Sequence, residues 1–200
     1  MGRETTRSLR NEFEKEILEK ARSNGPPAPL FITIFLGAND ACLMGEDTIV
    51  PFDEYQDHIR YYVYKILESP ATKDTKIILI SPPPVDVHTP PGSHLVDDPS
   101  VAAILRKTAA SGLGHRTWQS KRRFAKKIVE IGKEFEKTTD LVAVLDFWTV
   151  VTKSACQAEG RDFDSLDLDE LLPGSGMPGA KEFGQEYFTD RLHLGKTVSP

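Results

Sequence analysis

The sequence is short of cysteine. It contains two cysteines in 200 residues, Cys42 and Cys156, and neither belongs to a CxxC pair or to a Cys/His metal-binding spacing. Such sparse use is typical of a reducing compartment and argues against a disulfide scaffold. We therefore expect a cytoplasmic protein without a structural metal.

The chain also lacks a net positive charge and long apolar runs. The net charge is −5 and the isoelectric point is near 5.6, which disfavours nucleic acid as a partner. No apolar run approaches the roughly 20 residues that span a bilayer, and Met1–Glu4 opens a polar helix rather than a signal peptide. The sequence predicts a soluble chain and leaves its oligomeric state open.

What is present is ordinary globular material. Hydrophobic residues make up 39% of the chain and charged residues 28%, which suits a domain with a sizeable core. We expect residues 1–200 to form one domain.

Three short apolar stretches predict β-strands, at residues 30–36, 76–80 and 141–145. The first contains a single polar side chain, Thr33, and is rich in β-branched and aromatic residues. This composition is typical of a parallel strand that is covered on both faces.

Amphipathic patterns between these stretches predict helices, at residues 4–23, 51–69, 101–111, 117–137 and 149–158. The first helix should bury a stripe that comprises Leu9, Phe13, Ile17 and Ala21. In the helix at 117–137, lysines and arginines should lie opposite the apolar face. Alternation of strands and helices predicts an α/β fold whose parallel sheet has right-handed connections.

Residues 159–182 differ in character, because they are acidic at first and then rich in glycine and proline. The acids at 162–170 invite a calcium interpretation. However, Asp167 stands where a calcium-binding loop of the EF-hand type needs glycine at its sixth position. We therefore predict a loop insertion or a short helix.

Two polar segments stand out as candidate chemistry. Gly37–Asp40 follows the first strand, and in parallel sheets ligand sites collect at the carboxyl ends of strands. Asp190 stands three residues before His193, a spacing that lets a carboxylate orient an imidazole acting as a general base. The amide of Asn39 can donate to a developing oxyanion, a contact worth about 2.7–4 kcal/mol in other hydrolases.

These segments resemble the blocks of the SGNH (GDSL-type) hydrolases, and within them the branch of isoamyl-acetate-hydrolysing esterases. The resemblance rests on four stretches and extends over nearly the whole chain: Thr33–Cys42, Val50–Tyr55, Ile80–Asp86 and Asp190–His193.

The resemblance implies a three-layer α/β/α sandwich with a flavodoxin-like parallel sheet, small carboxylic esters as substrates, and neither metal nor organic cofactor. By position, it assigns Asn39 to the oxyanion hole, Asp190 as the acid and His193 as the base. Gly37 would supply the tight turn, and Asp40 would bond the amides of that turn.

The sequence departs from the family in three ways. No Gly-Asp-Ser occurs in the 200 residues, so the family's nucleophile block is missing. Gly2 matches the family's oxyanion-hole glycine only ambiguously. The Gly-rich turn and closing helix that follow Asp-x-x-His in the family are absent. We therefore expect a domain that lacks both the first strand and the last helix of the family. The missing strand would leave a strand edge exposed.

Other residues are weaker candidates. Ser81 and Ser175 lack the strand–turn–helix context of a nucleophile. Cys42 is expected to be a small buried residue. His88 and His94 are expected in an exposed loop, where a metal site with Asp97 is the less favoured interpretation.

The two tryptophans, Trp118 and Trp148, are expected in or beside the core.

Three hypotheses follow. The chain is a carboxylic ester hydrolase that is weak or inactive for want of a serine. Alternatively, it is a non-catalytic binding or interaction module on the same scaffold. The third hypothesis is an incomplete gene assembly of an active esterase. It predicts an in-frame exon that encodes Gly-Asp-Ser in the genomic DNA upstream of Met1.

Overall fold

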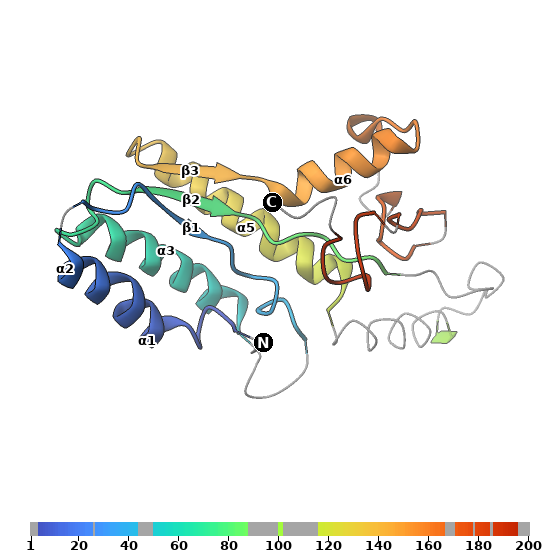
Figure 1. The fold of residues 1–200 in the computed structure, drawn as a ribbon. Helices are drawn as coiled ribbons and strands as arrows, with labels where there is room; N and C mark the ends of the chain where they lie inside the picture. The colour runs from blue at the N-terminus through green and yellow to red at the C-terminus, as the bar shows by residue number, and fades with distance from the viewer. Residues whose placement is uncertain are drawn as a thin grey trace. The chain divides into compact units, whose positions relative to one another are not determined.

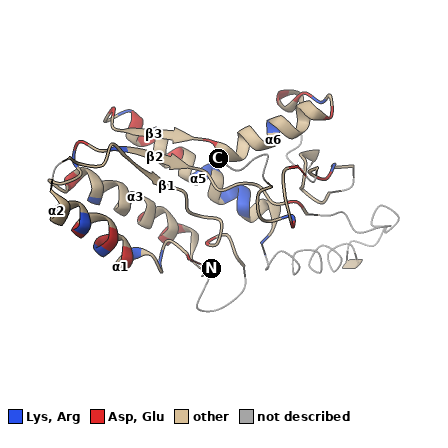
Figure 2. Ribbon diagram, viewed as in Figure 1, with Lys and Arg blue, Asp and Glu red and all other residues tan. Residues whose placement is uncertain are grey.

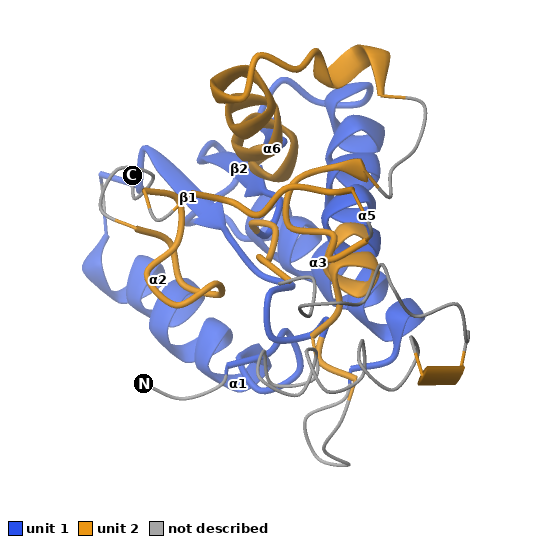
Figure 3. Ribbon diagram, turned by 90° about the vertical axis from the view of Figure 1, so that its right-hand side faces the viewer, with its two compact units in different colours: residues 1–41, 46–82, 123–146 blue, residues 42–45, 83–122, 147–200 orange. Residues whose placement is uncertain are grey.

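The computed structural model describes residues 4–25, 27–43, 50–87, 100–101, 116–166, 171–177, 179–184 and 186–195 (Figure 1). These residues divide into two compact units (Figure 3). Unit 1 contains residues 1–41, 46–82 and 123–146, and unit 2 contains residues 42–45, 83–122 and 147–200.

Unit 1 is built on a parallel sheet in the order β1-β2-β3, with β1 at Phe31–Ile34, β2 at Lys76–Ile80 and β3 at Val142–Leu145. Ile32 of β1 pairs with Ile77 of β2, which in turn pairs with Val142 of β3. The predicted parallel α/β fold is therefore confirmed.

Helices connect the strands as predicted. Helix α3 extends over Phe52–Glu68 and helix α5 over Trp118–Glu136. The part of α5 from Arg123 onward belongs to unit 1. Thr117 and Ser120 form a reciprocal cap at the start of α5, since each backbone N–H donates to the other's hydroxyl. Pro70 follows α3 and cannot continue it.

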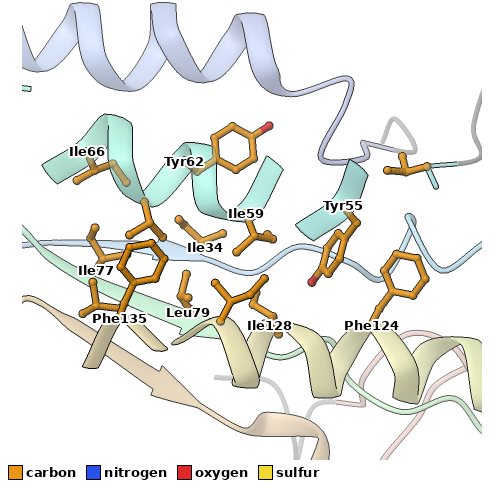
Figure 4. Packing of buried hydrophobic residues seen from close by; sticks show 14 of the residues in the cluster. Ile34, Tyr55, Ile59, Tyr62, Ile66, Ile77, Leu79, Phe124, Ile128 and Phe135 are labelled. Atoms are coloured by element: carbon orange, nitrogen blue, oxygen red, sulfur yellow. The ribbon is translucent and has the colours of Figure 1, made fainter. Parts of the chain in front are cut away.

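Both helices pack against one face of the sheet, and the core of unit 1 lies between them and the strands (Figure 4). Ile59 of α3, Ile77 and Leu79 of β2, and Ile128 of α5 are fully buried there. Tyr55 contacts Phe124 with ring centroids 4.7 Å apart, so the two helices also contact each other.

The prediction that the first strand is covered on both faces is wrong. Ile34 is buried, but Phe31 is 59% exposed and Phe35 is also exposed. Within the described sheet, β1 is an edge strand that pairs with β2 alone. A groove beside this edge is lined by side chains that include Leu9, Phe13, Ile32 and Tyr62.

The N-terminal helical segment comprises α1 at Arg10–Glu12, a π-helical stretch at Phe13–Glu19 and α2 at Lys20–Asn24. Acidic and basic residues are interspersed along it (Figure 2). The expected buried stripe is wrong at Ile17, which is 37% exposed, whereas Leu18 is buried. A π-helical turn takes more residues than an α-helical turn, so it shifts the buried face along the sequence.

Unit 2 contains α6 at Phe147–Ala158 and a short 3-10 helix at Phe163–Ser165. Its core combines residues of α6 with residues from the C-terminal part of the chain: Val151, Ala155, Phe183, Tyr187 and Phe188. Residues 102–111 of the expected helix at 101–111 and the acids at 167–170 lie outside the described residues. In the described part of the chain, no helix is long and apolar enough to cross a membrane.

A basic side chain of α5 is buried, contrary to the sequence prediction. Lys121 is 1% exposed, and burial together with the nearby charge of Arg116 lowers its pKa to about 7. Lys121 stands three residues before Phe124 and seven before Ile128, so helical periodicity places it on the apolar face.

We predict that Gly132→Ala destabilises unit 1. A Cβ at Gly132 would stand 2.8 Å from the Cβ of Val144, where α5 approaches β3. Overpacking of this kind costs about 1–3 kcal/mol, more than the gain in helix propensity. Urea denaturation should show the loss, and Lys133→Ala on the exposed side of α5 should change stability little. Equal stability of Gly132→Ala and the wild type would contradict the close approach.

Candidate functional site

The tip that follows β1 depends on glycine at position 37. Gly37 has a φ of 111°, and a Cβ there would stand 2.8 Å from the hydroxyl of Tyr55. That hydroxyl donates to the carbonyl of Leu36 over 3.3 Å, and the N–H of Ala41 donates to the carbonyl of Gly37 over 3.1 Å. Only glycine allows the chain to turn so close to α3.

Asn39 lies at this tip and its amide is engaged. Its Nδ2 donates to the backbone carbonyl of Glu4 over 2.7 Å. The side chain can therefore donate to a carbonyl oxygen, which is the chemistry required of an oxyanion-hole residue.

Asp40 points away from solvent. Its side chain is 1% exposed, and Oδ1 accepts from both the backbone N–H and the hydroxyl of Thr6, over 2.9 and 2.5 Å. Burial raises the pKa of Asp40, and the hydrogen bonds from Thr6 oppose that rise. Asp40 thus ties the N-terminal segment to the tip.

His58 of α3 belongs to the same buried group, although the sequence did not single it out. Its Nδ1 lies 3.0 Å from the Thr6 hydroxyl, and its Nε2 lies 3.5 Å from Oε1 of Glu54. Burial lowers the pKa of His58, as do Arg10 and Arg7, whereas Glu54 and Asp40 act in the opposite direction.

In unit 2, the structure brings Asp190 and His193 together. Nδ1 of His193 lies 2.7 Å from Oδ2 of Asp190, and Oδ1 accepts from the backbone N–H groups of Leu192 and His193 over 3.1 and 2.7 Å. Burial raises the pKa of Asp190, but these hydrogen bonds outweigh it and leave the pKa below its usual value. The imidazole remains 74% exposed, so a small molecule can reach it.

The Asp-x-x-His turn has two further supports. Arg191 adopts a φ of 69°, and its carbonyl accepts from the N–H of Asp86 over 2.9 Å. The buried carboxylate of Asp86 also accepts from the N–H of Phe183 over 3.0 Å. Asp86 therefore joins the segment that follows β2 to the C-terminal loop, a role that its sequence position did not reveal.

The alternative serines are poorly placed for catalysis. Ser81 is buried and its hydroxyl donates to Asp146 over 3.2 Å, while Ser175 is also buried. Cys42 is buried as expected, as are Trp118 and Trp148.

Among the described residues, no cluster of histidines, cysteines and carboxylates could hold a metal. Gly2, His88, His94 and Asp97 lie outside them.

Comparisons with known proteins show similarity to esterases. It is 28% identical over 138 residues to a GDSL esterase/lipase of Arabidopsis thaliana, an alignment that covers 68% of this chain and 50% of the relative. It is 30% identical over 146 residues to an isoamyl acetate-hydrolyzing esterase 1 homologue of Rattus norvegicus, covering 72% of this chain and 49% of the relative. No family model matches.

A solved acetylxylan esterase from Geobacillus stearothermophilus aligns with a TM-score of 0.49 and 15% identity. The alignment covers 78% of this chain and 55% of that one.

The resemblance to the SGNH (GDSL-type) hydrolases is thus confirmed by the curated relatives. Within that family, its relatives include the isoamyl acetate-hydrolyzing esterase homologues, and the chain spans about half the length of the curated relatives described here.

We predict that His58→Asn weakens the pH dependence of stability. The unfolded chain protonates His58 near its ordinary pKa of 6.5, but the folded protein resists until a lower pH. Stability contributed by His58 is therefore present above pH 6.5 and is lost as the pH falls towards the folded pKa, by at most about 1.4 kcal/mol per pH unit. The raised pKa of Asp40 has the opposite effect on stability, because the folded state binds this proton at a higher pH than the unfolded chain does.

Urea denaturation at pH 7.5, 6.5 and 5.5 measures this effect. His58→Asn should lose less stability than the wild type over the series. His193→Asn keeps His58 and serves as the control. Equal losses in His58→Asn and the wild type would refute the prediction.

Proposed function

We propose that this chain carries the acid–base and oxyanion-binding residues of an SGNH-type carboxylic ester hydrolase acting on small esters. The observation that carries the proposal is the 2.7 Å contact between Nδ1 of His193 and Oδ2 of Asp190, beside an accessible imidazole. The curated esterase relatives support the same reaction class.

His193 would act as the general base. An Nδ1–H that donates to Asp190 leaves Nε2 unprotonated and able to take a proton from an attacking oxygen. Asp190 would hold the ring in that tautomer and stabilise the imidazolium that forms. Its three hydrogen bonds in the structure favour the ionised carboxylate that this role needs.

Asn39 would donate to the oxygen of the tetrahedral intermediate. Its Nδ2 already donates to a carbonyl oxygen, that of Glu4. Donors of this kind contribute about 2.7–4 kcal/mol to transition-state stabilisation in other hydrolases.

The attacking group would be water, because the sequence has no Gly-Asp-Ser and both Ser81 and Ser175 are buried. Loss of the serine of such a triad reduces turnover about a million-fold in a serine protease. We therefore propose a slow esterase, in which His193 activates water against the ester carbonyl.

Hydrolysis of p-nitrophenyl acetate tests this proposal. The wild-type chain should release p-nitrophenol slowly but above the uncatalysed rate, and His193→Ala should lose the excess. Asp190→Asn should lose most of it, because an amide favours the wrong tautomer of the imidazole. Lys133→Ala serves as the control for protein surface effects. An excess rate that survives His193→Ala would refute the role of His193.

A binding module on the same scaffold is the second candidate, and the burial of both Ser81 and Ser175 favours it. Titration with isoamyl acetate, followed by NMR signals of His193 and the Asn39 amide, separates the two. Shifts of both signals without hydrolysis of p-nitrophenyl acetate would favour binding alone.

A further inference from the structure

Thr6, in the N-terminal segment, makes several contacts at the tip that carries Asn39. Its backbone N–H and its hydroxyl both donate to Oδ1 of Asp40, and the hydroxyl lies 3.0 Å from Nδ1 of His58. The carbonyl of Thr6 accepts from the hydroxyl of Tyr62. Thr6 and Asp40 are both buried, so solvent cannot readily replace these bonds.

The hydroxyl of Thr6 lies between the side chains of Asp40 and His58. It carries one proton, and its 2.5 Å contact with Asp40 assigns that proton to the carboxylate. A lone pair then accepts from an Nδ1–H of His58. The hydroxyl thus connects the side chain of Asp40 to that of His58 in helix α3. The backbone groups of Thr6 add bonds to Asp40 and to Tyr62 of the same helix.

Next in the chain to Asp40 is Asn39, whose amide donates to Glu4, two residues before Thr6. The short segment Glu4–Thr6 therefore contacts both neighbouring side chains of the tip. Displacement of Thr6 would release the carboxylate of Asp40 and change the orientation of the Asn39 amide.

We propose that Thr6 is a positioning residue, which sets the orientation of the Asn39 amide through a buried link from Asp40 to His58. The proposal rests on the role of Asn39 in the proposed esterase. It adds a residue outside the Gly37–Asp40 tip on which the geometry of the oxyanion donor depends.

The matched pair Thr6→Val and Thr6→Ser tests the proposal. Valine preserves the shape of threonine and removes the hydroxyl, whereas serine keeps the hydroxyl. Thr6→Val should shift the NMR signals of the Asn39 side-chain amide. It should also speed hydrogen exchange of the Ala41 N–H about tenfold, which corresponds to the loss of one typical hydrogen bond. Thr6→Ser should restore both signals.

Thr72→Val provides the control. Thr72 is also fully buried, but its hydroxyl donates to the carbonyl of Ile66 over 2.8 Å, at the end of α3. It should lower the melting temperature as Thr6→Val does without changing the Asn39 amide or the exchange of Ala41. An effect of Thr72→Val equal to that of Thr6→Val would overturn the proposal, as would unchanged signals in Thr6→Val.

If Thr6→Val does not fold, the pair His58→Leu and His58→Asn carries the same test. Leucine removes the donor to Thr6 and should reproduce the shift, whereas asparagine keeps a donor and should not. All these readouts are independent of turnover. A chain without His193-dependent hydrolysis would refute the proposed esterase and leave the NMR result to decide the role of Thr6.

Discussion

The packing of two helices against one face of a parallel sheet is the constraint on which unit 1 depends. Ile77 and Leu79 of the middle strand are fully buried, and helices α3 and α5 contribute Ile59 and Ile128 to the same core. This packing brings α5 so close to β3 that no side chain fits at Gly132. It also places Tyr55 of α3 beside Gly37 in the turn that follows β1. His58 of the same helix lies beside Thr6, which bonds Asp40 of that turn.

The two candidate groups are stabilised by different physical means. Asp40 is buried, and its Oδ1 accepts two hydrogen bonds from Thr6, whose hydroxyl also lies 3.0 Å from His58. Asp190 is partly exposed, and local backbone N–H groups compensate its charge. A buried group tolerates little displacement, because any broken bond leaves a polar atom unsatisfied. An exposed pair can exchange partners with water, which suits an imidazole that must meet a substrate.

Much of the fold could be predicted because the signals are local. Apolar runs located β1, β2 and β3 to within one or two residues at each end, and periodic patterns located α3 and α5. The prediction failed where a signal depended on packing. The π-helical stretch moved the buried position from Ile17 to Leu18, and Lys121 lies on an apolar face despite its charge. The partners of Thr6, His58 and Asp86 could not be predicted, since they lie far from these residues in the sequence.

The sequence by itself determined the parallel α/β class, the resemblance to the SGNH hydrolases and the Asp190–His193 pair, because each rests on patterns that are local in the sequence. Only the tertiary structure decided that Asn39 donates to Glu4, that Asp40 is buried against Thr6 and that Ser81 is inaccessible. The physical reason is that burial and long-range hydrogen bonds arise from the joint packing of distant segments. A pattern within any one segment does not contain that information.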